Sequence, residues 1–170
     1  MENVRQSAEE VLFTLEEELG LLGDLLGLAR EKTRLLSHAD AEGLKGLLAQ
    51  EEETVASLRE KEAAREKRAK RLARAVGIPD GRATLRALAE GTPDADCARR
   101  LTDAGGRMLR TVRELTRQSE KARRLLRHQV RYTDFMLGVL SRPEKSAHFY
   151  NMQGGREEES GFFSRLDYHA

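Results

Sequence analysis

The stretch LTDAGGRMLRTVRELTRQSEKARRLLRHQVRYTDFMLGVL, residues 101–140, decides the fold. Apolar or small residues recur along it in alternating steps of four and three, which places them on one face of a helix. Arg142-Pro143 ends the pattern, because proline cannot continue a helix. We therefore predict one helix from about Asp96 to Leu140, on the order of 65 Å long. Its apolar face comprises Leu101, Gly105, Met108, Val112, Leu115, Ser119, Ala122, Leu126, Gln129, Thr133, Met136 and Leu140.

A similar spacing runs through residues 4–36 and again through residues 44–76. Between them, Ser37-His38-Ala39-Asp40 interrupts the pattern, and Asp40 is suited to cap a new helix by accepting a bond from a free amide. Two long antiparallel helices are the simplest prediction, and a single bent helix is the alternative. Gly20, Gly23 and Gly27 each cost up to about 1 kcal/mol relative to alanine, which a closely packed partner helix would offset.

The connection to the last helix contains several helix-breaking residues. Gly77-Ile78-Pro79 should end the second helix, because glycine stops a helix and proline cannot extend it. Asp80 is then expected to cap a short helix from Gly81 to Glu90. The following Gly91-Thr92-Pro93-Asp94 predicts a turn.

Composition limits the fold class and the location of the protein. Charged residues make up 35% of the 170 residues, aromatic residues 5%, and tryptophan is absent. Such a chain buries narrow apolar stripes between helices rather than a wide core, so we expect an all-α fold. Lone Cys97 excludes an internal disulfide framework and fits a reducing compartment. No apolar run approaches the roughly 20 residues of a membrane span, and the N-terminus does not resemble a signal peptide. We expect a soluble cytoplasmic protein without membrane insertion.

The near-neutral net charge of +1 hides a strong pattern along the chain. Residues 1–58 carry 13 acidic and 5 basic residues, residues 59–74 carry 3 and 8, and residues 99–131 carry 3 and 11. The favoured explanation is that acidic and basic helices lie side by side. A nucleic-acid-binding surface is the alternative, but the basic segments interleave almost no aromatic residues for base stacking and match no DNA-reading motif. We predict no nucleic-acid partner.

Motifs for catalysis, metal binding or cofactor binding are not found in the sequence. His38, His128, His148 and His169 are scattered, without the spacing of a zinc site. Cys97, beside two arginines, could have a lowered pKa, although a small residue near a helix start is the favoured interpretation. We therefore predict no enzyme, no metal and no cofactor.

The C-terminal segment differs in composition from the rest of the chain. Five of the eight aromatic residues lie in the last 22 positions. We expect a helical domain at residues 1–142 and a flexible tail at residues 143–170. The aromatic residues either bind partners or fold back over the helices. Small or polar residues in the long helix, such as Ser119 and Gln129, indicate either a groove for another helix or an ordinary surface.

Three stretches of the chain carry a resemblance to a known family: LLSHADAEGLKGLL (residues 35–48), the long helix around LTRQSEKA (residues 115–122) and YNMQG (residues 150–154). They resemble the FlgN family of flagellar export chaperones. Their order and spacing cover nearly the whole chain. The family usually carries a pair of asparagines where this chain has Ser119 and Ala122.

The resemblance implies a helical cytoplasmic chaperone that binds hook-associated junction proteins and delivers them to the flagellar type III export gate. It assigns gate docking to Tyr150 and Gly154. It assigns substrate binding to the long helix, which here comprises Leu115, Ser119, Ala122, Leu126, Gln129 and Thr133. A structural or adaptor coiled coil that self-associates as a homo-oligomer is the alternative.

Overall fold

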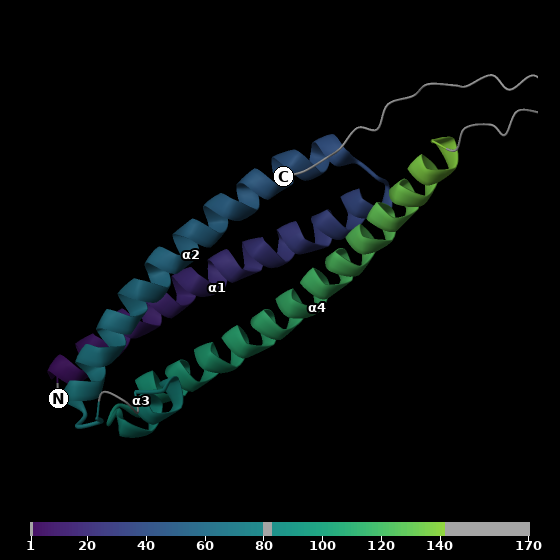
Figure 1. The fold of residues 1–170 in the computed structure, drawn as a ribbon. Helices are drawn as coiled ribbons and strands as arrows, with labels where there is room; N and C mark the ends of the chain where they lie inside the picture. Colours follow the sequence, from purple (N-terminus) through teal and green to yellow (C-terminus); the bar gives the residue numbers. More distant parts are fainter. Residues whose placement is uncertain (1, 80–82, 142–170) are drawn as a thin grey trace, which may run out of the picture.

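The computed structural model describes residues 2–79 and 83–141. These residues form four helices and no strand, which confirms the all-α prediction (Figure 1). The helices are α1 (Glu2–Ser37), α2 (Ala41–Ala75), α3 (Leu85–Gly91) and α4 (Ala95–Leu140).

The turn between α1 and α2 confirms the helical hairpin. Ala39 adopts a left-handed conformation with φ of 54°, and the Asp40 N–H donates back to the Leu35 carbonyl at 3.0 Å. The Asp40 carboxylate accepts a hydrogen bond from the Gly43 N–H at 2.9 Å, as expected for the cap of a new helix. The alternative of a single bent helix is therefore wrong, since α1 and α2 run antiparallel from this turn (Figure 1).

The connection at the other end is partly as predicted. Gly77 has φ of 78°, and the Ile78 N–H donates to the Ala73 carbonyl at 2.8 Å, so the glycine stop is confirmed. The bounds predicted for the short helix are wrong. It begins at Leu85, where the Thr84 hydroxyl accepts from the Ala87 N–H at 3.1 Å. The predicted cap, Asp80, lies outside the described residues.

The end of α3 and the start of α4 also differ slightly from the prediction. Gly91 belongs to α3 rather than to the turn that follows. The Asp94 carboxylate then caps α4 by accepting from the amides of Asp96 and Cys97, at 3.0 and 3.1 Å. This cap explains why α4 begins at Ala95, one residue before the predicted start.

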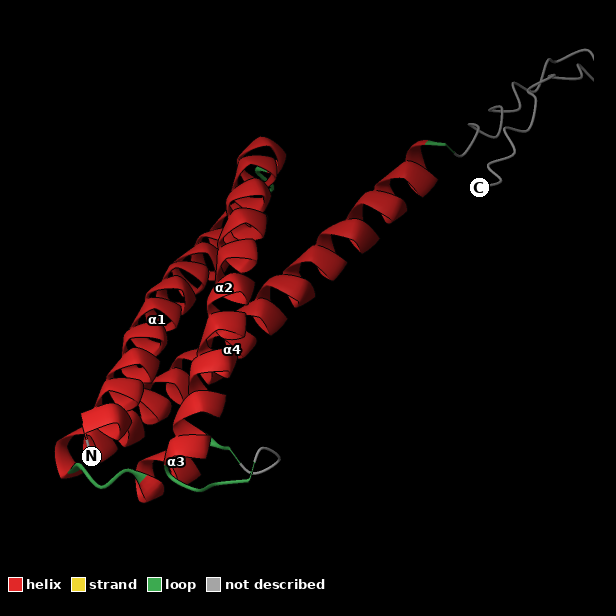
Figure 2. Cartoon of the chain, turned by 90° about the vertical axis from the view of Figure 1, so that its left-hand side faces the viewer, coloured by secondary structure: helices red, strands yellow, loops and turns green. Residues whose placement is uncertain are grey.

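Helix α1 occupies the middle of the arrangement, with α2 on one side and α4 on the other (Figure 1). Helix α3 packs on α4 and touches α2, whereas α2 and α4 have little direct contact with each other. The C-terminal part of α4 projects away from the hairpin (Figure 2). The bundle is therefore closed at the α3 end and open at the other.

The best-packed core lies at the α3 end. Each helix contributes a fully buried leucine to it: Leu15, Leu72, Leu88 and Leu101. Burying a leucine contributes about 1.5–3 kcal/mol of hydrophobic free energy, so this layer is a major source of stability. Alanines such as Ala8 and Ala104 complete the layer and let the helices approach one another.

Ion pairs link α1 to both of its neighbours. Its glutamates pair with basic residues of α2 and α4, as in Glu10–Arg71, Glu17–Lys61, Glu18–Arg65 and Glu16–Arg107. This confirms that acidic and basic helices lie side by side. The acidic helix α1 pairs with both basic segments, one on α2 and one on α4.

The three glycines of α1 do not admit a neighbouring helix of this chain. A β-carbon added at Gly20, Gly23 or Gly27 would meet nothing within 4 Å. All three lie on the exposed face of α1. The expectation that helix packing offsets their cost is therefore wrong within the described chain.

Candidate partner-binding site

The apolar face predicted for α4 separates into two stripes of seven-residue periodicity. The residues of the first stripe are buried or half-buried, and we call it the inner stripe: Leu101, Met108, Leu115, Ala122 and Gln129. The second stripe is exposed apart from half-buried Gly105, and we call it the outer stripe: Gly105, Val112, Ser119, Leu126 and Thr133. The two stripes are adjacent on the helix, because successive members differ by three or four residues.

The six predicted substrate-binding residues are therefore divided between the stripes. Three belong to the inner stripe, and one of them, Gln129, donates its side-chain amide to the Leu36 carbonyl at the end of α1. The other three, Ser119, Leu126 and Thr133, are exposed. Only the outer-stripe residues are thus fully available to a partner without moving α1.

The C-terminal end of α4 carries an exposed apolar surface that the sequence interpretation did not include in the site. Gln129 is the last half-buried residue of α4, and every residue from 130 to 141 is exposed. Leu140, for example, is 76% exposed. The large apolar residues of this surface, which we call the apolar end, are Val130, Tyr132, Phe135, Met136, Leu137, Val139 and Leu140. The sequence feature that indicates this surface is the high proportion of apolar residues after position 129, because they occur on every side of the helix.

A cleft of about 840 Å³ separates the apolar end from the α1–α2 turn. Leu35 and Leu36 of α1 and Leu44 of α2 line one wall. Three of the six predicted residues, Leu126, Gln129 and Thr133, lie on the α4 wall, whereas the other three do not line it. The complete α4 wall is Leu126, His128, Gln129, Val130, Tyr132, Thr133 and Asp134.

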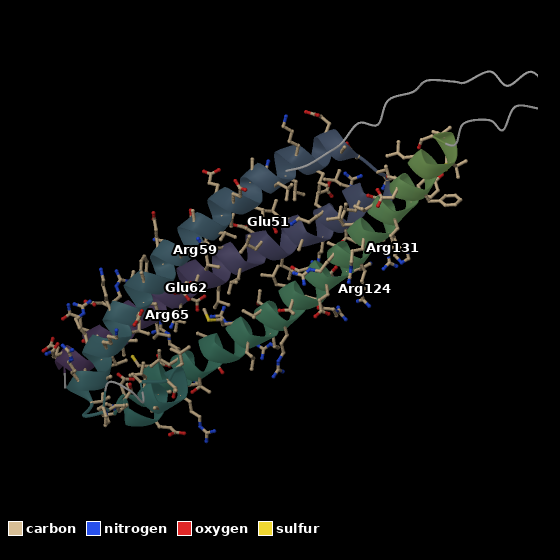
Figure 3. The ribbon with its side chains drawn as sticks, in the orientation of Figure 1. Glu51, Arg59, Glu62, Arg65, Arg124 and Arg131 are labelled. Carbon is tan, nitrogen blue, oxygen red and sulfur yellow. The ribbon has the colours of Figure 1, made fainter. Side chains whose placement is uncertain are left out.

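The surface of α4 that points away from α1 is basic. Arg124 and Arg131 project from α4 on the side opposite the hairpin (Figure 3). A few acidic groups reduce this charge, and hydrogen bonds from Gln118 and Arg117 hold the pKa of the Glu114 carboxyl below its usual value. An apolar cleft bounded by a basic helix is suited to an amphipathic partner rather than to a small polar substrate.

Comparison with protein families decides the identity. A family model described as FlgN protein matches residues 1–158 of the chain. The chain belongs to the FlgN family. Membership supports a general role as a flagellar export chaperone. Comparison with curated proteins and with solved structures gives no significant match.

The FlgN match also covers Tyr150 and Gly154, the residues predicted to dock at the export gate. Both lie outside the described residues, as does the whole of the predicted tail at residues 143–170. Of the residues predicted for binding and docking, the structure therefore describes only those on α4.

The described part of the chain does not place its cysteine where a reactive thiol would be expected. Cys97 is buried, and burial, together with nearby Asp94, raises the pKa of its thiol. The alternative of a lowered thiol pKa is therefore wrong, and Cys97 is a packing residue of α4. No group of three or more metal-ligating side chains occurs among residues 2–79 and 83–141. No helix formed by these residues is long and apolar enough to span a membrane.

Proposed function

We propose that this FlgN-family chain binds hook-associated junction proteins of the flagellum in the cytoplasm. It keeps them from assembling prematurely and delivers them to the type III export gate. The observation that supports the proposal is the apolar end of α4, which none of the other described residues covers and which lies beside an open cleft. Large exposed apolar surfaces of this kind mark protein-interaction sites. An amphipathic segment of a junction protein would cover it by helix-in-groove recognition.

The direct test is titration calorimetry against the purified junction proteins of the same organism. Full-length protein and residues 1–142 should both form tight one-to-one complexes, because the proposed surface lies before residue 142. Leu126→Asp should abolish binding by placing a charge in the cleft. Leu109→Asp is the matched control, since Leu109 is similarly exposed on α4 but does not line the cleft. Equal binding by both variants would contradict the assignment of the cleft.

Delivery to the export gate is assigned to Tyr150 and Gly154, which lie within the matched residues 1–158. An aromatic anchor separate from the cleft would let the client be released while the gate is held. Tyr150→Ala should leave the affinity for junction proteins unchanged and weaken binding to the purified gate component. A loss of both affinities to the same extent would show that the two roles are not separate.

A self-associating coiled coil is the second candidate, and the same uncovered α4 end supports it. It predicts that the chain alone forms a defined oligomer through the apolar end and binds no junction protein. Sedimentation equilibrium over a range of concentrations separates the two candidates, because the chaperone proposal does not require the free chain to oligomerise.

A further inference from the structure

The three long helices α1, α2 and α4 leave room for a fourth long helix beside α2 and α4. The short helix α3 occupies this place at one end only. Gly105 of α4 faces α3, because a β-carbon added there would lie 3.7 Å from the Leu85 side chain. Ala69 of α2 belongs to the same core cluster as Leu88 of α3, and Val76, the C-cap residue of α2, packs against this cluster. Helix α3 has only seven residues, about 10 Å of helix, so it covers only the beginning of the space between α2 and α4.

The surface of α4 that contacts α3 continues beyond it as exposed positions, of which Val112 and Leu126 are apolar and Ser119 is polar. Seven-residue steps from Gly105 lead along the outer stripe to Val112, Ser119 and Leu126. Val112 is 40% and Leu126 is 46% exposed. Because a step of seven residues returns to nearly the same face of a helix, these side chains face the side on which α3 lies.

Helix α2 presents a comparable series, which the charged residue Glu62 interrupts. Steps of seven residues back from Val76 and Ala69 lead to Glu62, Val55 and Leu48. Leu48 is 44% exposed, and Leu48 and Val55 line a hollow of about 460 Å³ on α2. One turn further, Leu44 lines the cleft opposite Leu126, so the apolar series of α2 and α4 meet there.

The two walls carry opposite charge. Residues 41–62 of α2 contain six acidic and three basic residues, a net charge of −3. Residues 112–140 of α4 contain three acidic and seven basic residues, a net charge of +4. Exposed Arg123 and Arg127 lie next to the outer stripe, and Glu52 and Glu62 lie on α2 (Figure 3 labels Glu62).

We propose that the groove above α3 binds one amphipathic helix of the client protein as the fourth helix of the bundle. This helix carries acidic residues on the flank that meets α4 and basic residues on the flank that meets α2. The proposal rests on the proposed function and adds α2 and a charge pattern to it. The span from Val112 to Val130 corresponds to about 27 Å, or roughly 18–20 residues of bound helix.

A client helix fits this groove better than a second copy of the chain does. The apolar end of α4 has one basic and one acidic residue between positions 130 and 140, so it lacks the two charged flanks that the groove would bind. The opposite charges of the two walls also determine the direction in which the client helix binds. Turning an amphipathic helix end over end exchanges its flanks, so only one direction pairs both flanks with opposite charge.

The test uses the full-length chain and titration calorimetry with the purified junction proteins. Leu48→Asp should weaken binding by about tenfold or more, because it places a charge on the apolar α2 wall, outside the α4 surface of the proposed function. Ala49→Asp is the matched control, because the exposed neighbouring side chain points about 100° away from Leu48. Circular dichroism establishes that both variants are folded. Unchanged binding of Leu48→Asp, with binding lost in Leu126→Asp, would overturn the fourth-helix site and leave the proposed function standing.

The charge pattern is tested by reversing two arginines. Arg123→Glu with Arg127→Glu should weaken binding by about tenfold at low salt and less at high salt, since salt screens exposed charges. Arg124→Glu with Arg131→Glu makes the same change of net charge on the side of α4 opposite the hairpin (Figure 3). Equal effects of the two double variants would overturn the charge pattern. A dimer of the free chain that Leu48→Asp dissociates would make a second copy the occupant and would also overturn the proposal.

A designed peptide separates this inference from the proposed function. If no junction protein binds the wild-type chain, the proposed function fails, and the groove is tested with a 20-residue amphipathic helix that has one acidic and one basic flank. This peptide should bind more tightly than a peptide of identical composition with both charge signs mixed on each flank. Equal affinity of the two peptides for the wild-type chain would overturn the groove.

Discussion

Gly20, Gly23 and Gly27 occupy helical positions of α1 where any side chain would fit, because nothing lies within 4 Å of their β-carbon positions. Replacing each by alanine should therefore raise the free energy of unfolding by about 0.5–1 kcal/mol, since alanine loses less backbone entropy on forming a helix. Urea unfolding followed by circular dichroism measures the change.

Gly43→Ala is the control for this prediction. Its β-carbon would lie 2.7 Å from an oxygen of the Asp40 cap and 2.9 Å from the Leu35 side chain. We expect this variant to be no more stable than the wild type. A loss of stability in the three α1 variants would show that the glycines serve a contact within the chain.

Glu18 and Arg65 form the most deeply buried ion pair linking α1 and α2. The Arg65 Nε lies 2.9 Å from both carboxylate oxygens, and the Glu18 side chain is 2% exposed. Burial raises the pKa of Glu18, and the Arg65 guanidinium opposes this rise. Arg65→Met should therefore destabilise the protein by about 3 kcal/mol at pH 7, because it leaves a buried carboxylate without its partner.

The pH dependence of this variant has a definite sign. A glutamate whose folded-state pKa is above its unfolded value binds more protons in the folded state, so its contribution to stability is lost as pH rises through the folded pKa. Arg65→Met should thus recover stability relative to wild type as pH falls from 7 towards the usual pKa of glutamate. Arg71→Met is the control, because its partner Glu10 is about one-third exposed. A constant difference between Arg65→Met and wild type from pH 7 to pH 5 would contradict the prediction.

The sequence alone predicted the role of a single residue correctly when that role depends only on residues nearby in the chain. Asp40 was predicted as a cap because a cap needs only its own helix. Cys97 was different, because the flanking arginines favour a thiolate whereas burial by other helices disfavours it. The second effect is visible only in the folded structure.

At the scale of helices, the length of α4 was predictable and its packing face was not. The inner and outer stripes have the same spacing, so no pattern in residues 101–140 tells which of them α1 covers. Only the position of α1, which puts the Leu36 carbonyl beside Gln129, decides it. The short helix was placed wrongly because Asp80 and Thr84 both qualify as caps, and local sequence does not rank them.

The uncovered end of α4 should be the least protected part of that helix. Residues 131–140 are exposed and no other described helix covers them, so we expect their amides to exchange hydrogen within seconds, whereas amides near Leu101 exchange slowly. Binding of a junction protein should slow exchange in residues 126–140. Hydrogen exchange with mass spectrometry measures both states. Protection of residues 131–140 equal to that near Leu101 in the free chain would show that something already covers this end.

At the scale of the molecule, the charge pattern correctly predicted that acidic and basic helices are neighbours. The net charge of a whole segment does not depend on the exact position of any one residue, so this prediction did not require the details of packing. The unequal packing of the two ends could not be inferred in the same way. It arises because α3 is short and reaches only one end, and local signals in the sequence did not give the correct bounds of this helix. The result is a molecule with a packed end and an open end.

Stability and binding should therefore respond to different leucines. Leu88 is fully buried at the packed end, so Leu88→Ala should lower the free energy of unfolding by about 2–5 kcal/mol. Provided that the variant remains folded at low temperature, its affinity for junction proteins should be unchanged, because the cleft is at the other end of the bundle. Leu126→Ala should lower that affinity and change stability by less than about 0.5 kcal/mol, since Leu126 is 46% exposed. Urea unfolding and titration calorimetry on both variants measure the four quantities. If Leu126→Ala destabilised the free chain as much as Leu88→Ala does, the open end would be part of the core, and the separation of the two ends would be wrong.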